Sequence, residues 1–198
     1  DYIDVFCEKN YYTPEETDLI LSEGRKVNLV PKIHVNQFNA IGGVQIGVEH
    51  GALSVDHLEV MRAEDIEILT GTDTMPTALP SCSFFLGIPY APVKEIIDAG
   101  LPLALASDYN PGSTPSGNMN FVVSLGCIKM GLTPEQAINA ATINSAYAMG
   151  LSKEMGSIAI GKKANVFITK EIPSYSFLPY SFGQSVIETT ILNGIIVS

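Results

Sequence analysis

The sequence has few charged and few basic residues, and this scarcity excludes several classes of protein. Only 16% of its 198 residues are charged, against 46% that are hydrophobic, whereas globular chains carry about 25% charged residues. A disordered chain is excluded, because such chains are rich in charge and poor in apolar residues. Eleven basic against 21 acidic residues give a formal charge of −10, which would repel a phosphate backbone. We therefore expect no nucleic-acid partner.

Long apolar runs and paired cysteines are also missing. No uninterrupted apolar stretch approaches the roughly 18 residues of a membrane span, and the first residues show no basic segment followed by an apolar one, as a secretion signal would. Cys7, Cys82 and Cys127 form no CxxC pair, so neither a disulfide framework nor a cysteine-rich zinc site is indicated. We expect no membrane partner and a reducing, cytoplasmic compartment.

Glycine-rich phosphate loops are absent too, since neither GxGxxG nor GxxxxGK[ST] occurs. Short apolar segments alternate instead with capped helical ones. We expect strands at 2–7, 27–34, 54–57 and 103–107, and helices at 13–23, 44–50, 63–69, 92–99, 118–130 and 133–149. Strands that alternate with helices form a parallel sheet with helical crossovers. Because the strands are apolar without alternation, we expect them to be buried on both faces, as in a doubly wound sheet or a barrel.

The character of the sequence changes after Gly150. A turn and a strand are expected within 156–168, and Asn193-Gly194 between two apolar segments is a strong hairpin signal. We therefore predict an α/β body in residues 1–154 and a small β unit in residues 155–198. The chain starts with a strand-like segment rather than with Met, and we expect it to be a piece of a longer protein.

Polar residues stand at the ends of three expected strands. His34, His57 and Asp108 each come last in their segment, and ligands of parallel α/β sheets bind at this edge. Two imidazoles and a carboxylate suit a divalent metal site or a proton-shuttling site. Each residue also has a purely structural interpretation: a histidine can be a hydrogen-bonded strand end, and Asp108 can stabilise the turn in Asp-Tyr-Asn-Pro-Gly.

The neighbours of these residues leave further alternatives open. Asp56 and Glu59 flank His57 and could orient its ring, or they could face solvent. Cys82 has no obvious paired base, and we expect it to be buried and inert. His50 stands at an expected helix end, where it would interact with the helix dipole.

Four segments together match the pattern of a known family. They are Lys32–His34 with Phe38, Ala52–Glu59, Ser81–Leu86 and Ala106–Ser113. On these residues the chain resembles the metal-dependent amidohydrolase superfamily and, more narrowly, the imidazolonepropionase family. Gly156–Ile168 resembles the superfamily's return into a composite β-sandwich, so the resemblance covers essentially the whole chain.

The resemblance implies both a fold and a reaction. The fold would be the C-terminal part of a (β/α)8 metal-dependent hydrolase barrel, with residues 155–198 forming part of a composite β-sandwich. The reaction would be the hydrolysis of 4-imidazolone-5-propanoate to N-formimidoyl-L-glutamate in histidine degradation, by water that one divalent metal, zinc or iron, activates. The full-length protein would act on this small molecule as a homodimer.

The resemblance also implies roles for single residues. His34 and Asp108 would be metal ligands, and Asp108 would also shuttle a proton. His57 would contact the substrate carbonyl or the activated water as a second catalytic residue. The residues implied to bind substrate or product are Gln37, Asn110, Gly112 and Ser113.

Two departures from the family pattern limit these implications. Gln37 stands where many members have Glu, and an amide cannot act as a base. The HxH motif that supplies two metal ligands in the family is absent. We therefore expect this segment alone to be inactive and to bind metal weakly. Two alternatives stay open: an amidohydrolase for another cyclic amide, and a non-catalytic binding module derived from a barrel.

Overall fold

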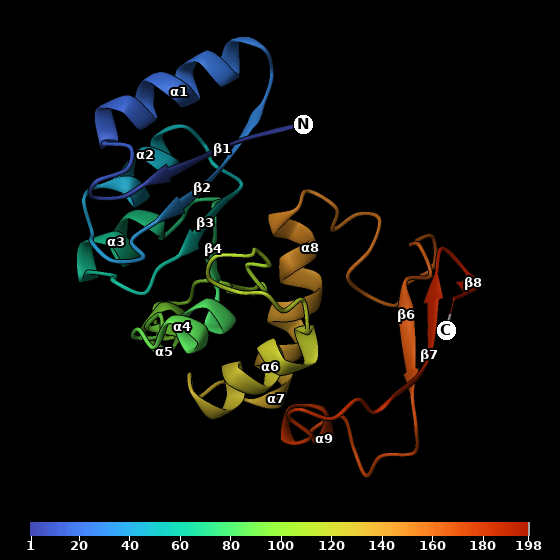
Figure 1. The fold of residues 1–198 in the computed structure, drawn as a ribbon. Helices are drawn as coiled ribbons and strands as arrows, with labels where there is room; N and C mark the ends of the chain where they lie inside the picture. The colour runs from blue at the N-terminus through green and yellow to red at the C-terminus, as the bar shows by residue number, and fades with distance from the viewer. Residues whose placement is uncertain (198) are drawn as a thin grey trace.

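The computed structural model describes residues 1–197, and its centre is a five-stranded sheet (Figure 1). The strands follow one another in chain order, and every neighbouring pair is parallel. They are β1 (Tyr2–Cys7), β2 (Val30–Val35), β3 (Ser54–His57), β4 (Met75–Ala78) and β5 (Ala104–Leu105). The sheet is open within residues 1–197, because β1 and β5 each have one strand neighbour in it. The expected βα alternation is thus what the chain adopts.

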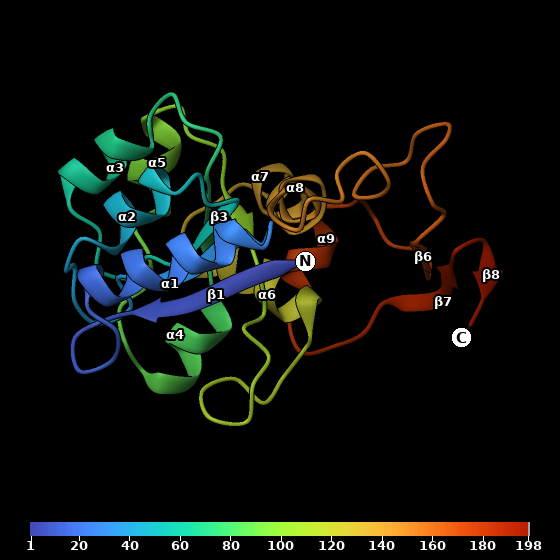
Figure 2. The same ribbon diagram turned by 90° about the horizontal axis from the view of Figure 1, so that it is seen from above.

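The first five helices connect the successive strands of this sheet, and the remaining helices follow β5. They are α1 (Pro14–Lys26), α2 (Gly43–Glu49), α3 (Ala63–Leu69), α4 (Pro80–Leu86), α5 (Val93–Asp98), α6 (Met119–Ile128), α7 (Pro134–Asn139), the π-helical turn η1 (Ala140–Asn144), α8 (Ser145–Ala148) and α9 (Phe177–Tyr180). Figure 2 shows α1, α2 and α3 side by side along the sheet. The core lies between these helices and the strands, where Ile33, Val55 and Leu21 are fully buried. None of the helices in the described residues is long and apolar enough to cross a membrane.

Burial differs between the early and the late strands. In β2, burial alternates, so that Ile33 and Val35 face the helices while Lys32 and His34 lie on a partly exposed face. In β4, all four residues are buried. β4 was not among the expected strands; of those that were, β5 is buried on both faces, whereas the expectation is wrong for β1 and β2. Their second face carries Asp4, Lys32 and His34 and is only partly covered, by the hydrogen bond of Lys32 to a carbonyl of α8.

Gly24 does not end the first helix, contrary to expectation. It lies inside α1, and a Cβ atom built on it would approach the Ile3 side chain of β1 to 2.7 Å. The helix continues to Lys26 because glycine here permits close packing of helix on strand rather than a left-handed end. Pro31 lies within β2 and pairs with Ile3 of β1.

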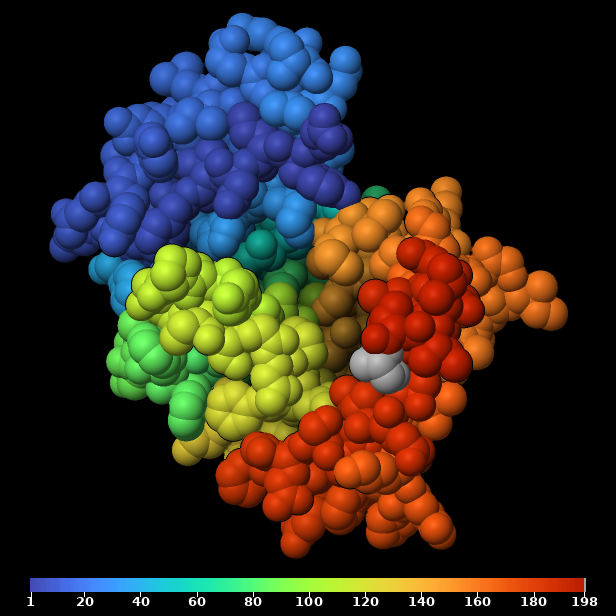
Figure 3. Space-filling model, turned by 45° about the vertical axis from the view of Figure 1, so that its right-hand side comes forward, coloured from blue at the N-terminus to red at the C-terminus, as the bar shows by residue number. Residues whose placement is uncertain are grey.

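The C-terminal segment forms a separate antiparallel sheet. It consists of β6 (Val166–Thr169), β7 (Ile187–Leu192) and β8 (Ile195–Ile196). The expected hairpin is present, and both Asn193 and Gly194 have positive φ angles, 51° and 82°, as the turn of a two-residue hairpin requires. Figure 3 shows this C-terminal part lying beside the α6 segment, which α9 contacts. This unit therefore packs against helices of the α/β body, mainly α9 on α6, and shares no strand pairing with the five-stranded sheet in the described residues.

Candidate active site

The three candidate residues converge at the carboxyl edge of the parallel sheet. His34 lies near the end of β2, His57 is the last residue of β3, and Asp108 follows β5. One ligand atom from each lies within 4.8 Å of the others. The two imidazole rings are 5.5 Å apart between centroids, and Phe6 of β1 contacts both rings. Residues 74 positions apart in the chain thus form one cluster, because parallel strands bring their carboxyl ends to one edge.

The backbone is strained where it presents this cluster. His57, Leu58 and Asp108 have positive φ angles of 88°, 69° and 53°, a conformation that is costly for residues with a Cβ atom. Leu58 is fully buried, and its N–H donates to the carbonyl of Val35 at 3.3 Å. The anchoring of Leu58 in the core holds the turn that presents His57.

His34 is paired with a carboxylate of the neighbouring strand. Its Nδ1 lies 2.8 Å from Oδ1 of Asp4 in β1, which leaves Nε2 for the cluster. Burial lowers the pKa of His34, but the hydrogen bond and charge of Asp4 outweigh it, so the pKa is raised overall. Both side chains are partly exposed, His34 at 32% and Asp4 at 51%.

His57 is paired with a carboxylate that is almost completely buried. Its Nδ1 lies 3.3 Å from Oε1 of Glu59, and the hydroxyl of Ser83 in α4 donates to the same oxygen at 3.1 Å. The side chains of His57 and Glu59 are 4% and 1% exposed. The sequence left two alternatives for Glu59, contact with the ring of His57 or exposure to solvent. The structure contains the contact, so the second alternative is wrong.

Asp108 is held by the turn that follows it. The Asn110 amide donates to the Asp108 carbonyl and to the Ser113 hydroxyl, both at 2.8 Å. Its oxygen accepts from the backbone N–H groups of Gly112 and Ser113, also at 2.8 Å. The Ser113 hydroxyl lies 3.3 Å from Oδ2 of Asp108. Because the Asn110 side chain is fully engaged within the turn, its direct effect here is to fix Asp108.

Gln37, two residues after β2, is hydrogen-bonded to a cysteine. It is 7% exposed, and its Nε2 donates to Sγ of Cys82 at 3.3 Å. Burial raises the pKa of the Cys82 thiol to about 12. Cys82 is therefore protonated at neutral pH and is a poor nucleophile, because the thiolate is the reactive form.

Three carboxylate and hydroxyl partners were not predicted from the sequence. Asp4 and Ser83 are the partners described above, and Glu8 accepts from the N–H groups of Phe38 and Asn39 at 2.9 and 3.1 Å. Asp4 could have been found only from the register of β1 on β2. Ser83 was missed because α4 was not expected as a helix.

The donor set fits a divalent metal ion. Two imidazole nitrogens and one carboxylate oxygen are ligands that zinc and iron accept, and their spacing within 4.8 Å is compatible with one shared ion. A second group at the same spacing, formed by His57, Glu59 and Cys82, fits less well, because these side chains are already hydrogen-bonded and the thiol is protonated.

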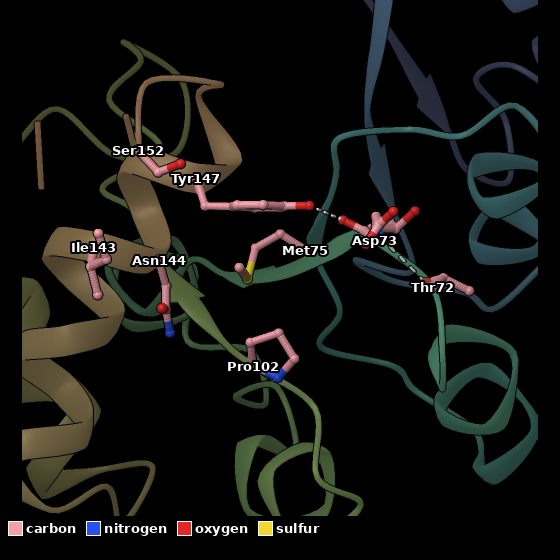
Figure 4. A pocket seen from close by; sticks show the side chains of 9 residues that line it. Thr72, Asp73, Met75, Pro102, Ile143, Asn144, Tyr147 and Ser152 are labelled. Carbon is pink, nitrogen blue, oxygen red and sulfur yellow. Dashed lines mark hydrogen bonds between the residues drawn. The ribbon is translucent and has the colours of Figure 1, made fainter. Parts of the chain in front are cut away.

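A hollow of about 490 Å³ lies at the other end of the sheet. Figure 4 shows Tyr147 reaching across it toward Asp73, whose carbonyl accepts the Tyr147 hydroxyl hydrogen bond at 3.0 Å. Met75 at the start of β4 and Pro102 before β5 also line the hollow. The hollow therefore lies at the amino ends of the strands, away from the histidine cluster.

Comparison with known proteins agrees with the resemblance found in the sequence. The model of the Amidohydrolase family matches residues 12–197. The chain is 67% identical over 194 residues to an imidazolonepropionase of Christiangramia forsetii. This match covers 98% of the present chain and 47% of that protein. It is 66% identical over 197 residues to an imidazolonepropionase of Flavobacterium johnsoniae. This match covers 100% of the present chain and 48% of that protein. The chain thus spans about half the length of the curated relatives it matches.

A solved structure shows the same fold at low identity. An adenosine deaminase from Xanthomonas campestris with bound zinc superposes with a TM-score of 0.82 and 14% identity, over 98% of this chain and 51% of that one. The expected fold class, part of an amidohydrolase α/β barrel with an attached β unit, is confirmed. The chain therefore belongs to the amidohydrolase family.

Proposed function

We propose that the full-length protein containing this chain hydrolyses 4-imidazolone-5-propanoate to N-formimidoyl-L-glutamate, the histidine-degradation step performed by imidazolonepropionases. The observation that carries the proposal is the convergence of His34, His57 and Asp108 within 4.8 Å at the carboxyl edge of the sheet. The names of the relatives at 66–67% identity point to the same reaction. Hydrolysis of a cyclic amide needs an activated water, an oxyanion stabiliser and a proton carrier, and this cluster offers the chemistry for each.

One divalent metal, zinc or iron, would be held by His34 and Asp108, with His57 beside it. When bound, it supplies the Lewis acidity that makes water a nucleophile at neutral pH. Because Asp4 engages Nδ1 of His34, Nε2 is the nitrogen that would bind the ion.

The reacting protons would be carried by Asp108. Its carboxylate takes a proton from the attacking water and delivers it to the ring nitrogen that departs when the C–N bond breaks. General acid–base help of this kind contributes about 10²–10⁴ in rate. His57 lies beside it and would stabilise the negative charge that develops on the substrate oxygen. For this its ring carries a proton on Nε2, in addition to the Nδ1 proton whose hydrogen bond Glu59 accepts.

The substrate would be held by Gln37 and by the turn of Asn110, Gly112 and Ser113. Gln37 favours a second candidate, an amidohydrolase for a different cyclic amide. Its buried amide can donate and accept hydrogen bonds but cannot take a proton. A substrate ring that needs no base at this position would suit it.

The deciding measurement is the loss of imidazolone ultraviolet absorbance on adding the full-length protein, with and without a chelator. Rapid loss that the chelator abolishes is the expected result. If metal is bound and the absorbance persists, the reaction is wrong and other cyclic amides become the substrates to test. Absence of both metal and turnover would favour a non-catalytic module.

Further expectations concern the whole assembly. We propose residues 1–154 as the barrel part and 155–198 as the sandwich part, because the two sheets share no strand pairing in the described residues. The isolated chain is expected to bind zinc weakly and to show no turnover. We also propose that the full-length protein is a cytoplasmic homodimer, which sedimentation and cell fractionation would test.

A further inference from the structure

We propose that Glu59 is a positioning residue that fixes the ring of His57 for the reaction, with Ser83 as its support. The inference deepens the proposed function and rests on it for its kinetic test. It depends on the buried contacts of Glu59. It also depends on how these contacts differ from those of Asp65, a second buried carboxylate six residues further along the chain.

The first step of the argument is geometric. The left-handed turn at His57 and Leu58 ends β3 and brings Glu59 against the ring of His57. The N–H of Val60 donates to the carbonyl of Asn36 at 2.8 Å and ties the turn to the end of β2. The carboxylate therefore has little freedom to move away from the ring.

The second step concerns the two ring nitrogens. Oε1 of Glu59 already accepts the Ser83 hydroxyl, and from this geometry we infer that it also accepts from the ring, so that Nδ1 of His57 carries the proton of this contact. Nε2 is then the nitrogen left for Asp108 and His34, whose ligand atoms lie within 4.8 Å of His57. Glu59 thus selects both the tautomer and the rotation of the ring.

The third step is the contrast with Asp65 in α3, whose side chain is also 1% exposed. Both oxygens of Asp65 are engaged: Oδ1 accepts from Nη2 of Arg62, and Oδ2 accepts from Arg62 and Asn36. This is the pattern of a structural carboxylate. Glu59 instead uses Oε1 for both His57 and Ser83, while its buried Oε2 has no partner among the described residues.

An unpartnered buried oxygen is costly, and a carboxylate at this place carries that cost. The hydrogen bond that connects Glu59 to the candidate site is the one with the ring of His57. The incomplete pairing is therefore explained by an action on the ring rather than by stabilisation of the fold.

The test compares Glu59→Gln with Asp65→Asn in the full-length protein loaded with metal. Glu59→Gln should lower kcat about 10–100-fold, as loss of a partner that orients a site residue does, while KM changes less than about threefold. Asp65→Asn should lower the thermal midpoint and leave kcat unchanged. Ser83→Ala removes only the support of Glu59 and should lower kcat by a smaller factor. This variant tests the same positioning role if Glu59→Gln does not fold.

A double variant tests whether Glu59 acts through His57. In a His57→Gln background, Glu59→Gln should cause no further loss of kcat, because the ring it orients is gone. Additive losses would overturn the proposal. So would a folded Glu59→Gln protein with the kcat of the wild type.

A spectroscopic readout separates this inference from the proposed function. The imidazole ¹⁵N shifts of His57 should show a protonated Nδ1 in the wild type and a mixture of tautomers in Glu59→Gln, because an amide both donates and accepts. Unchanged shifts would contradict the inference. If the wild type does not act on imidazolone, the proposed function fails, and the ¹⁵N shifts still decide the role of Glu59.

Discussion

The ends of β2 and β3 each present a histidine held by a carboxylate, but the two pairs are built differently. His34 is held from outside its own strand, by Asp4 of β1, and both side chains are partly exposed. His57 is held by Glu59, two residues further along, and both side chains are buried. The second pair spans a left-handed backbone turn at His57 and Leu58 and has a support from another element, Ser83 of α4.

The difference indicates two uses of the same chemical pairing. A partly exposed pair contributes little to stability, so Asp4 can tune His34 as a ligand that exchanges with solvent and metal. A buried pair is rigid and expensive, so it suits a residue whose orientation must not vary. We therefore expect substitutions at the two ends to change different measured quantities.

The largest expected effect comes from Asp108, which faces both pairs. Asp108→Asn in the full-length protein should lower kcat about 10²–10⁴-fold, because the amide cannot carry the proton. Absorbance-based turnover is the measurement, and Asp98→Asn, an exposed carboxylate of α5, is the matched control that should keep wild-type activity. Retained turnover in Asp108→Asn would remove it from the reaction.

The next effect should separate the two pairs. Asp4→Asn should weaken metal affinity about 10–100-fold, because the carboxylate that orients His34 and raises its basicity is lost. At saturating metal, kcat should stay within about threefold of the wild type. Competition with a chromophoric chelator measures the affinity. The comparison fails if Asp4→Asn lowers kcat at saturating metal as strongly as Glu59→Gln does.

A stability effect distinguishes a structural carboxylate from both pairs. Asp65→Asn should lower the free energy of unfolding by about 2 kcal/mol at pH 7, from lost charge-assisted hydrogen bonds. Burial raises the pKa of Asp65, but its bonds to Arg62 outweigh burial and lower it. Its stabilisation is thus present above the ordinary carboxyl pKa of about 3.9 and is lost as pH falls through the lowered value. Urea titrations at pH 7 and pH 3 should show the difference between variant and wild type shrinking with acid.

The smallest effect is expected at a third histidine–carboxylate pair, which joins helices α1 and α2. Nε2 of His50, at the end of α2, lies 2.7 Å from Oδ1 of Asp18 in α1. Asp18→Asn should change the free energy of unfolding by at most about 1 kcal/mol, because Asp18 is exposed. Turnover and metal affinity should not change. A loss of metal affinity here would show that such pairs act on the site through the fold as a whole.

The order of strands and helices could be predicted from the sequence because helix caps and turns depend on a few neighbouring residues. Thr13-Pro14 and Thr133-Pro134 begin α1 and α7 with capping boxes, and Asn193-Gly194 closes the β7–β8 hairpin. Helix α4 was missed because Pro80–Leu86 has no polar N-cap and its C-terminal glycine, Gly87, was not recognised as a helix end. Gly24 was misinterpreted because close packing on Ile3 is not a local property.

The candidate site shows the same division. His34, His57 and Asp108 were identified because each ends an apolar segment, which local sequence reveals. Their partners were not all identifiable, since Asp4 reaches His34 only through the register of two parallel strands, and Ser83 reaches Glu59 only through the packing of α4.

The sequence by itself thus determined the alternating elements, the separate C-terminal hairpin and the three polar strand ends, because capping, turn and burial preferences act over a few residues. Only the tertiary structure decided that the three ends form one cluster within 4.8 Å, that Glu59 turns to the ring of His57 and that Asn110 fixes Asp108. These contacts depend on strand register, on strained φ angles that the buried core maintains, and on helices packed from distant parts of the chain.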